Sequence, residues 1–212
     1  MKNNFKRIIL YSTAVFLILL MYSCNSSKKR ALIGESDYQQ RLNTSYKDGS
    51  KSPLKKKDLK TFKGLKFFPI DSSFVINANL IRIKNAASFE MATTTDRKPI
   101  YKEYGILYFK LDGKDFSLTV YQSQDDLKDE KYKDYLFLPF TDNTSGNKSY
   151  GGGRYMDLMI EDLKKDGSIT VNFNNTYNPY CVYNDKYSCP LTPRKNHLDL
   201  KINAGIMAFK EN

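Results

Sequence analysis

A glycine-rich stretch before an arginine contains the side chains best suited to bind a ligand. Three glycines at positions 151–153 directly precede Arg154. Glycine accepts positive φ and lets a row of backbone N–H groups approach an anion, and arginine adds a planar, permanently charged set of donors. The pattern predicts an anionic ligand, a small molecule or a polymer, near Arg154. The alternative is a bulged turn in which Arg154 pairs internally with Asp142 or Asp157.

Catalytic machinery is harder to assemble from the same region. Asp142, Thr144 and Ser145 place a carboxylate beside hydroxyls, but a serine nucleophile needs a base, and the single histidine, His197, is far along the chain. No G-x-S-x-G elbow is present, and no Gly-Lys-Ser/Thr follows the glycines as in a nucleotide P-loop. Turn hydrogen bonds explain Asp142 and Ser145 more simply. We expect no cofactor and leave open whether the protein is an enzyme.

Tyrosine is the most abundant aromatic residue, with 16 residues against no tryptophan. Tyrosine rings with their hydroxyl tips suit sugars and amphipathic ligands, but they also form the rim of a small β core. The sequence does not separate these two interpretations. The candidate ligand-binding residues are Arg154, Asp142, Ser145, Tyr150, Gly151, Gly152, Gly153, Tyr155 and Asn178.

The cysteines have different predicted fates. Cys24 belongs to the N-terminal signal described next, which leaves Cys181 and Cys189. Two thiols in an oxidising compartment usually pair, so we expect a disulfide between them. Unpaired buried thiols are one alternative and a metal site is another. Because C-x7-C-x7-H with His197 lacks a fourth ligand, we expect no metal.

The N-terminus predicts export and attachment to a lipid. Lys2, Lys6 and Arg7 precede an apolar run that is closed by Cys24. The run has about 14 residues, whereas a membrane-spanning helix needs roughly 20. We therefore expect residues 1–24 to be a lipoprotein signal peptide that is cleaved to leave Cys24 as the lipidated N-terminus. The alternative is an uncleaved anchor with an incidental cysteine.

The chain is basic, with 34 Lys and Arg residues against 23 Asp and Glu and a net charge of +11. Export argues against a nucleic-acid partner, so the charge fits anionic lipid headgroups, envelope polymers or simply a solvated basic flank. No acidic run follows Cys24, and by analogy with lipoprotein sorting this favours a protein that faces the periplasm. We expect a lipid-anchored protein of the cell envelope.

The apolar pattern divides the chain into a flexible tether at residues 25–35 and a single mainly-β domain at residues 36–212. Ser36 can cap a short helix that presents Tyr38 and Leu42 on one face, and a second helical turn is expected around residues 59–65. One or two short helices therefore precede the strands.

Alternating apolar residues and turns indicate the strands. Asp112-Gly113 is a strong hairpin signal, and Pro139 is expected to end the strand in which it lies. Short strands separated by turns predict an antiparallel barrel or sandwich. The expected strands span residues 74–83, 106–111, 116–121, 135–140, 169–173, 198–202 and 206–209.

Three sequence blocks carry a family resemblance. They are L-F-L-P-F-x-D-x-T-S-G at 136–146, Y-G-G-G-R-Y at 150–155, and N-P-Y-C followed by C-P-L between 178 and 191. In these blocks the chain resembles a bacterial family whose function is not established and many of whose members are exported lipoproteins. The resemblance spans roughly residues 40–209 and implies a fold but no substrate.

The chain also departs from the family pattern. Asn172 stands where that family commonly has Asp, Asn175 where a basic residue is common, and Lys195 where Glu is common. An acid–base role that depends on that Asp or Glu is therefore not implied for this chain.

The leading hypothesis is a periplasm-facing lipoprotein of unknown function that binds an anionic ligand near Arg154. One alternative is an enzyme in which Asp142, Arg154 and nearby tyrosines carry out acid–base chemistry on an envelope component. A structural envelope protein is another. The lack of a nucleophile–base pair favours binding over catalysis.

Overall fold

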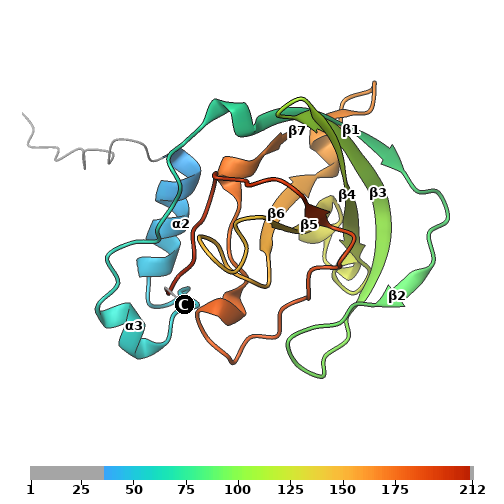
Figure 1. Cartoon of the computed structure of the whole chain (residues 1–212). Coiled ribbons are helices and arrows are strands. Elements are labelled where there is room, and N and C mark those ends of the chain that lie inside the picture. The colour runs from blue at the N-terminus through green and yellow to red at the C-terminus, as the bar shows by residue number, and fades with distance from the viewer. Residues whose placement is uncertain (1–35, 211–212) are drawn as a thin grey trace, which may run out of the picture. The chain divides into compact units, whose positions relative to one another are not determined.

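A computed structural model describes residues 36–210 (Figure 1). The predicted signal peptide, the lipidation site Cys24 and the predicted tether lie outside the described residues. The described part is a mainly antiparallel sheet that curves into a half-barrel with few helices, and this confirms the predicted fold class.

Six strands form the path of the sheet, in the order β6-β5-β4-β3-β1-β7, and each pairs antiparallel with its neighbours. β2 adds to β3, and β8 pairs with β5 in parallel. Among the described strands no ladder joins β6 to β7, so the half-barrel is open between these two edges. The strands are β1 (Val75–Arg82), β2 (Ser88–Glu90), β3 (Ile100–Leu111), β4 (Lys114–Ser123), β5 (Tyr135–Asp142), β6 (Arg154–Met159), β7 (Ser168–Asn172) and β8 (His197–Leu198).

The β3–β4 hairpin follows from local sequence. Asp112 and Gly113 adopt φ of 50° and 72°, the left-handed geometry that a two-residue hairpin turn requires. Leu107 and Phe109 point into the core, and Tyr108 between them is 46% exposed. Side chains alternate across a strand, so this pattern fixes which face of the hairpin is buried.

The N-terminal helices lie together to the left of the sheet in Figure 1. α2 (Asp37–Lys47) begins at Ser36 with the capping-box hydrogen bonds between Ser36 and Gln39. Tyr38 and Leu42 are half-buried, and Tyr46 on the same face is buried. α3 (Lys56–Lys60) is shorter and earlier than the helical turn expected at residues 59–65.

Short 3-10 helices connect several of the strands. The first precedes β1, two lie between β4 and β5, and the others follow β6 and β7. They span Ser72–Phe74, Asp126–Lys128, Glu130–Tyr132, Ile160–Asp162, Phe173–Asn175 and Tyr180–Val182.

Two strand predictions are wrong. Pro139 does not end β5, which continues to Asp142, because Pro139 keeps its place opposite Tyr155 in the β5–β6 ladder and the residues after it pair with β6 and β8. The C-terminal apolar stretches contain only β8 and an isolated bridge between Phe67 and Ile206. Leu198 and Ile202 are buried in the main core of the sheet, and Ile206 is buried in a separate cluster with Tyr46 of α2, so these side chains are covered without pairing as two strands.

β5 and β6 are covered on both faces. We call the face toward the half-barrel interior the inner face, and the opposite one the outer face. The inner face joins the main core through Leu136, Leu138, Phe140, Met156 and Leu158. The outer face joins a separate aromatic cluster through Tyr135, Phe137 and Tyr155.

Candidate ligand-binding site

Arg154 is fully buried on the inner face, with an exposed fraction of 0%. One terminal nitrogen, Nη2, donates to Asp142 Oδ2 at 3.3 Å and to the carbonyl oxygen of Ile202 at 2.9 Å. The other, Nη1, donates to the carbonyl oxygen of Ala204. The guanidinium also lies 5.2 Å from the ring centroid of Phe140. Arg154 therefore fastens the C-terminal segment to β5 and β6.

This position favours the interpretation in which Arg154 pairs internally, and it selects Asp142 over Asp157 as the partner. Burial lowers the pKa of the guanidinium, and the Asp142 charge opposes that change. Arginine stays charged under such conditions, so the contact is a buried ion pair. A ligand would reach Arg154 only if the surrounding segments moved.

The polar residues beside Arg154 are engaged within the protein. Asp142 Oδ2 accepts the backbone N–H of Ile202 at 2.6 Å. The hydroxyls of Thr144 and Ser145 donate to Asp142 Oδ1 at 2.8 and 3.2 Å. Asn178 is buried and donates through Nδ2 to the carbonyl oxygen of Met207 at 2.9 Å. These contacts leave Asp142, Ser145 and Asn178 in structural positions.

The glycine run allows close packing. Gly153 has φ of 96°, and a Cβ there would lie 2.6 Å from the carbonyl oxygen of Phe140. A Cβ at Gly152 would lie 2.5 Å from the Tyr150 ring, whereas Gly151 is open enough to accept one. The turn thus requires glycine for steric reasons at two of its three positions, independently of any anion.

The two cysteines lie next to each other. The backbone N–H of Cys181 donates to Cys189 Sγ at 3.1 Å, and neither cysteine forms a disulfide in the structure. A hydrogen bond between the thiols lowers the pKa of Cys181 and raises that of Cys189. The disulfide stays a prediction.

A cavity of about 580 Å³ lies against the outer face of β5 and β6. We call it the tyrosine pocket. Its walls come from α2, from β3, β5 and β6, from the segment after β4 and from the loop at residues 177–190. It is lined by Tyr38, Leu42, Tyr101, Asp126, Tyr132, Tyr135, Phe137, Tyr155, Asp157, Tyr177, Pro179, Tyr180, Tyr187, Ser188, Cys189 and Pro190.

Asp157 is the carboxylate that faces these rings. The hydroxyl of Tyr135 donates to Asp157 Oδ1 at 2.8 Å, and the hydroxyl of Tyr177 donates to the same oxygen. No Lys or Arg among the described residues forms an ion pair with Asp157. Solvent reaches the carboxylate although protein surrounds most of it, and this burial raises its pKa while the two tyrosine hydrogen bonds lower it in part.

The pocket wall is a chain of aromatic contacts. The ring of Tyr155 meets Phe137 edge-on with centroids 4.6 Å apart, and it meets Tyr177 edge-on at 5.9 Å. Tyr101 continues the chain at 5.9 Å from Phe137. The hydroxyl of Tyr155 donates to the carbonyl oxygen of Pro190 in the opposite loop. Edge-to-face pairs have a preferred geometry, so the wall is held in place before any ligand arrives.

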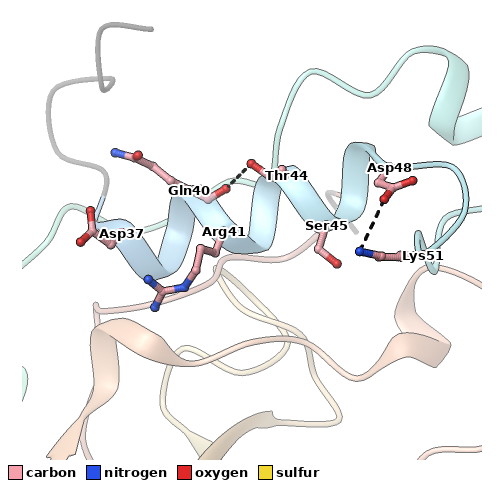
Figure 2. A pocket seen from close by; sticks show the side chains of 7 residues that line it. All are labelled: Asp37, Gln40, Arg41, Thr44, Ser45, Asp48 and Lys51. Carbon is pink, nitrogen blue, oxygen red and sulfur yellow. Dashed lines mark hydrogen bonds and ion pairs between the residues drawn. The ribbon is translucent and has the colours of Figure 1, made fainter. Parts of the chain in front are cut away.

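Other hollows are poorer candidates. The one in Figure 2 measures about 490 Å³ and consists of one polar face of α2 and the turn after it, including the Asp48–Lys51 ion pair at 3.9 Å. A third hollow, of about 360 Å³, lies at the open edge between β6 and β7 and shares Asp157 with the tyrosine pocket. Ligand pockets usually combine apolar walls with a few polar groups, and the tyrosine pocket fits that description best.

Within residues 36–210, no group of three or more His, Cys, Asp or Glu side chains is arranged to hold a metal ion. None of the helices in this part of the chain combines the length and the apolar character needed to cross a membrane.

A family model described as a protein of unknown function (DUF1684) matches residues 60–207. The chain belongs to this family. An uncharacterised protein of Haloarcula marismortui, whose structure was solved by solution NMR, is 32% identical, with a TM-score of 0.64 over 82% of this chain and 92% of that one. No curated protein matches the chain.

Sequence reasoning found only one of the pocket residues as a site candidate, Tyr155. It missed Tyr38, Tyr135 and Asp157 as ligand contacts, and it left Tyr177 undecided between a ligand surface and the rim of the core. One usable signal was present, because residues 154 and 157 of a strand lie on opposite faces. The strand after the glycines therefore carries a charged side chain toward each side of the sheet.

Proposed function

We propose that the chain is a lipid-anchored protein of the cell envelope, facing the periplasm, that binds a small molecule in the tyrosine pocket. The observation that carries the proposal is a cavity of suitable size whose aromatic wall surrounds a carboxylate without a cationic partner. The anchor and the compartment rest on the N-terminal sequence pattern.

The proposed ligand site differs from the one expected at Arg154. A guanidinium that is already paired with Asp142 and with carbonyl oxygens has little to gain from an anion. Asp157 has no such internal partner. The family match adds no activity, since the family is itself described as of unknown function.

A tryptophan reporter tests the pocket. The chain has no tryptophan, so Leu42→Trp places a single indole in the pocket wall. The full-length lipidated variant, in lipid nanodiscs, is titrated with small organic cations, organic anions and neutral sugars. We expect at least one class to shift the indole emission in a saturable way, because a bound molecule replaces water beside the ring.

Ile81→Trp is the matched control. Ile81 is 55% exposed on β1 and does not line the pocket, so its emission should not respond to the same ligands. Equal responses at both positions, or no saturable response at position 42 to any of the three classes, would refute binding in the tyrosine pocket.

The anchor is tested separately with Cys24→Ala. We expect the variant to lose palmitate incorporation and to remain as an uncleaved precursor, because the lipid is attached to the cysteine thiol. Ser23→Ala, which keeps a small residue before the cysteine, should be processed normally. Unchanged palmitate labelling of Cys24→Ala would show that the proposed lipid attachment at Cys24 is wrong.

A further inference from the structure

We infer that the tyrosine pocket takes an organic cation, an ammonium group that carries apolar substituents. The inference rests on the proposed function and names its ligand class. Three features of the described residues carry it: the charges of the lining, the pairing of Asp157 and the engagement of the other polar groups.

The charge of the lining is opposite to that of the chain. The protein has a net charge of +11, yet no Lys or Arg lines the pocket, and its two charged lining residues are Asp126 and Asp157. Arg41 and Arg97 act on the pocket tyrosines Tyr38 and Tyr101 from outside the lining, since Arg41 lines the hollow along α2 and Arg97 donates to Ser188. An anion would therefore meet two carboxylates and no basic lining residue.

Asp157 is incompletely satisfied by the protein. Both tyrosine hydroxyls donate to Oδ1, and Oδ2 accepts no hydrogen bond from the described residues. Solvent reaches this carboxylate, and a molecule that covers it displaces water, which costs free energy unless that molecule brings a cation or further donors. A ligand that brings a positive charge supplies that compensation.

The rings add a second attraction for a cation. The face of a tyrosine ring is electron-rich and attracts ammonium groups within about 6 Å of its centroid. Two rim tyrosines already hold such groups, with Lys131 Nζ 5.0 Å from the Tyr132 centroid and Lys186 Nζ 4.9 Å from that of Tyr187. Among the described residues, no cation lies over the rings of Tyr135 and Tyr177, which bond to Asp157.

A neutral sugar fits the same pocket less well. Sugar hydroxyls need several hydrogen-bond partners, and the pocket has no Asn, Gln, Lys or Arg in its lining. The Tyr155 hydroxyl is engaged with Pro190, and the Ser188 hydroxyl lies 2.6 Å from Thr95 Oγ1 and accepts from Arg97. The polar groups that remain are tyrosine hydroxyls and the two carboxylates, so the lining offers a polyol no amide or guanidinium donor.

Three probes of one shape and different charge test the inference. Choline, 3,3-dimethyl-1-butanol and 3,3-dimethylbutyrate share a three-methyl head group but carry a positive, a zero and a negative charge. Their affinities are measured with the full-length Leu42→Trp protein in uncharged nanodiscs at about 0.15 M salt, which screens long-range attraction. We expect choline to bind at least about tenfold more tightly than the neutral alcohol, and the carboxylate to bind most weakly.

Two matched carboxylate variants test whether the preference for choline depends on Asp157. In Asp157→Asn the preference for choline over the alcohol should fall to about threefold or less, because the amide still accepts from both tyrosines but lacks the charge. Asp126→Asn removes the same charge from the exposed rim and should leave the preference within about twofold of its original value. Circular dichroism of both variants establishes that they fold.

The outcomes separate the inference from the proposed function. If the alcohol, the carboxylate or a sugar binds as tightly as choline, or if Asp157→Asn retains the full preference, the cation inference is wrong and the pocket is still a ligand site. If no probe and no member of the wider panel changes the emission of the reporter, both are wrong.

Discussion

The two faces of β6 handle charge in opposite ways. On the inner face, Arg154 is covered completely and is matched by Asp142 and by backbone carbonyl oxygens. On the outer face, Asp157 has two tyrosine hydroxyls and no cation. A charge that the protein itself neutralises serves the fold, whereas a charge left without a counter-ion in a cavity marks a place where another molecule can supply one.

The same comparison corrects a natural inference from sequence. An arginine after a glycine run suggests a ligand, and an aspartate three residues later suggests only an internal partner for that arginine. The fold reverses the two, because the strand turns Arg154 toward the main core and Asp157 toward the aromatic wall.

The largest change in stability is expected from a substitution on the inner face. Arg154→Met should lower the free energy of unfolding by about 3–5 kcal/mol, because it leaves Asp142 as a buried charge without its partner. Urea denaturation followed by circular dichroism measures the loss.

Arg97→Met is the matched control and should cost less than about 1 kcal/mol, since Arg97 is exposed and, among the described residues, its side chain hydrogen-bonds only to Ser188. If the two variants lose the same free energy of unfolding, the ion pair between Arg154 and Asp142 contributes no more to stability than an exposed side chain. The proposed difference between the two faces of β6 would then be wrong.

An intermediate change in stability is expected from the two cysteines. They belong to the loop at residues 177–190, which forms one wall of the tyrosine pocket. Closing a ring of about nine residues between Cys181 and Cys189 should raise the free energy of unfolding by about 2.5 kcal/mol in a chain-entropy estimate. Non-reducing mass spectrometry counts the free thiols, and denaturation with and without reductant gives the stability difference.

Cys189→Ser supplies the control, because its stability should not respond to reductant. Complete alkylation of both cysteines in the folded, exported protein would rule out the disulfide. Hydrogen exchange sharpens the comparison further: oxidation should slow exchange in the loop at 177–190 more than in β1 and β3.

The smallest change in stability is expected from a substitution of Asp157, and it is a gain where the substitution of Arg154 gives a loss. The raised pKa means that the folded state holds the Asp157 proton more tightly than the unfolded state does, so stability falls as pH rises through that pKa. Asp157→Asn should therefore match the wild type in acid and exceed it at neutral pH by less than about 1 kcal/mol, a small gain because solvent reaches the carboxylate.

Thermal unfolding between about pH 4 and about pH 8 measures the difference between the two proteins. The groups that face Asp157 do not interfere, because Tyr135, Tyr177, Tyr38 and Tyr180 all have a pKa raised above the usual tyrosine value and stay protonated in this range. A variant that is less stable than the wild type at neutral pH would assign Asp157 to the fold and remove the distinction between the two faces.

The parts of the fold that depend on local chemistry could be read from the sequence. The Ser36 cap and the Asp112-Gly113 turn each act over a few residues, and both are present. The C-terminal strands could not be judged in this way, since an apolar pattern indicates burial but does not distinguish a paired strand from a buried irregular segment. Ile202 is such a case, held by Asp142 and Arg154 rather than by a ladder.

The site was less accessible to sequence reasoning than the fold. The pocket brings Tyr38, Tyr101, Asp157 and Tyr187 together from four distant parts of the chain, and no spacing rule connects them. Tyr155 was found only because it neighbours the glycine run. The Arg154 side chain has the charge and geometry to bind an anion, but it lies on the face of the strand that is buried in the main core.

The position of α2 has a consequence for how the family can diversify. The family model begins at residue 60, after α2 has ended, yet Tyr38 and Leu42 form part of the pocket wall. One wall thus lies outside the residues that the family model matches, while Asp157 and most of the rings lie inside them. Substitutions on this face of α2 can therefore reshape the pocket without altering the strands of the half-barrel.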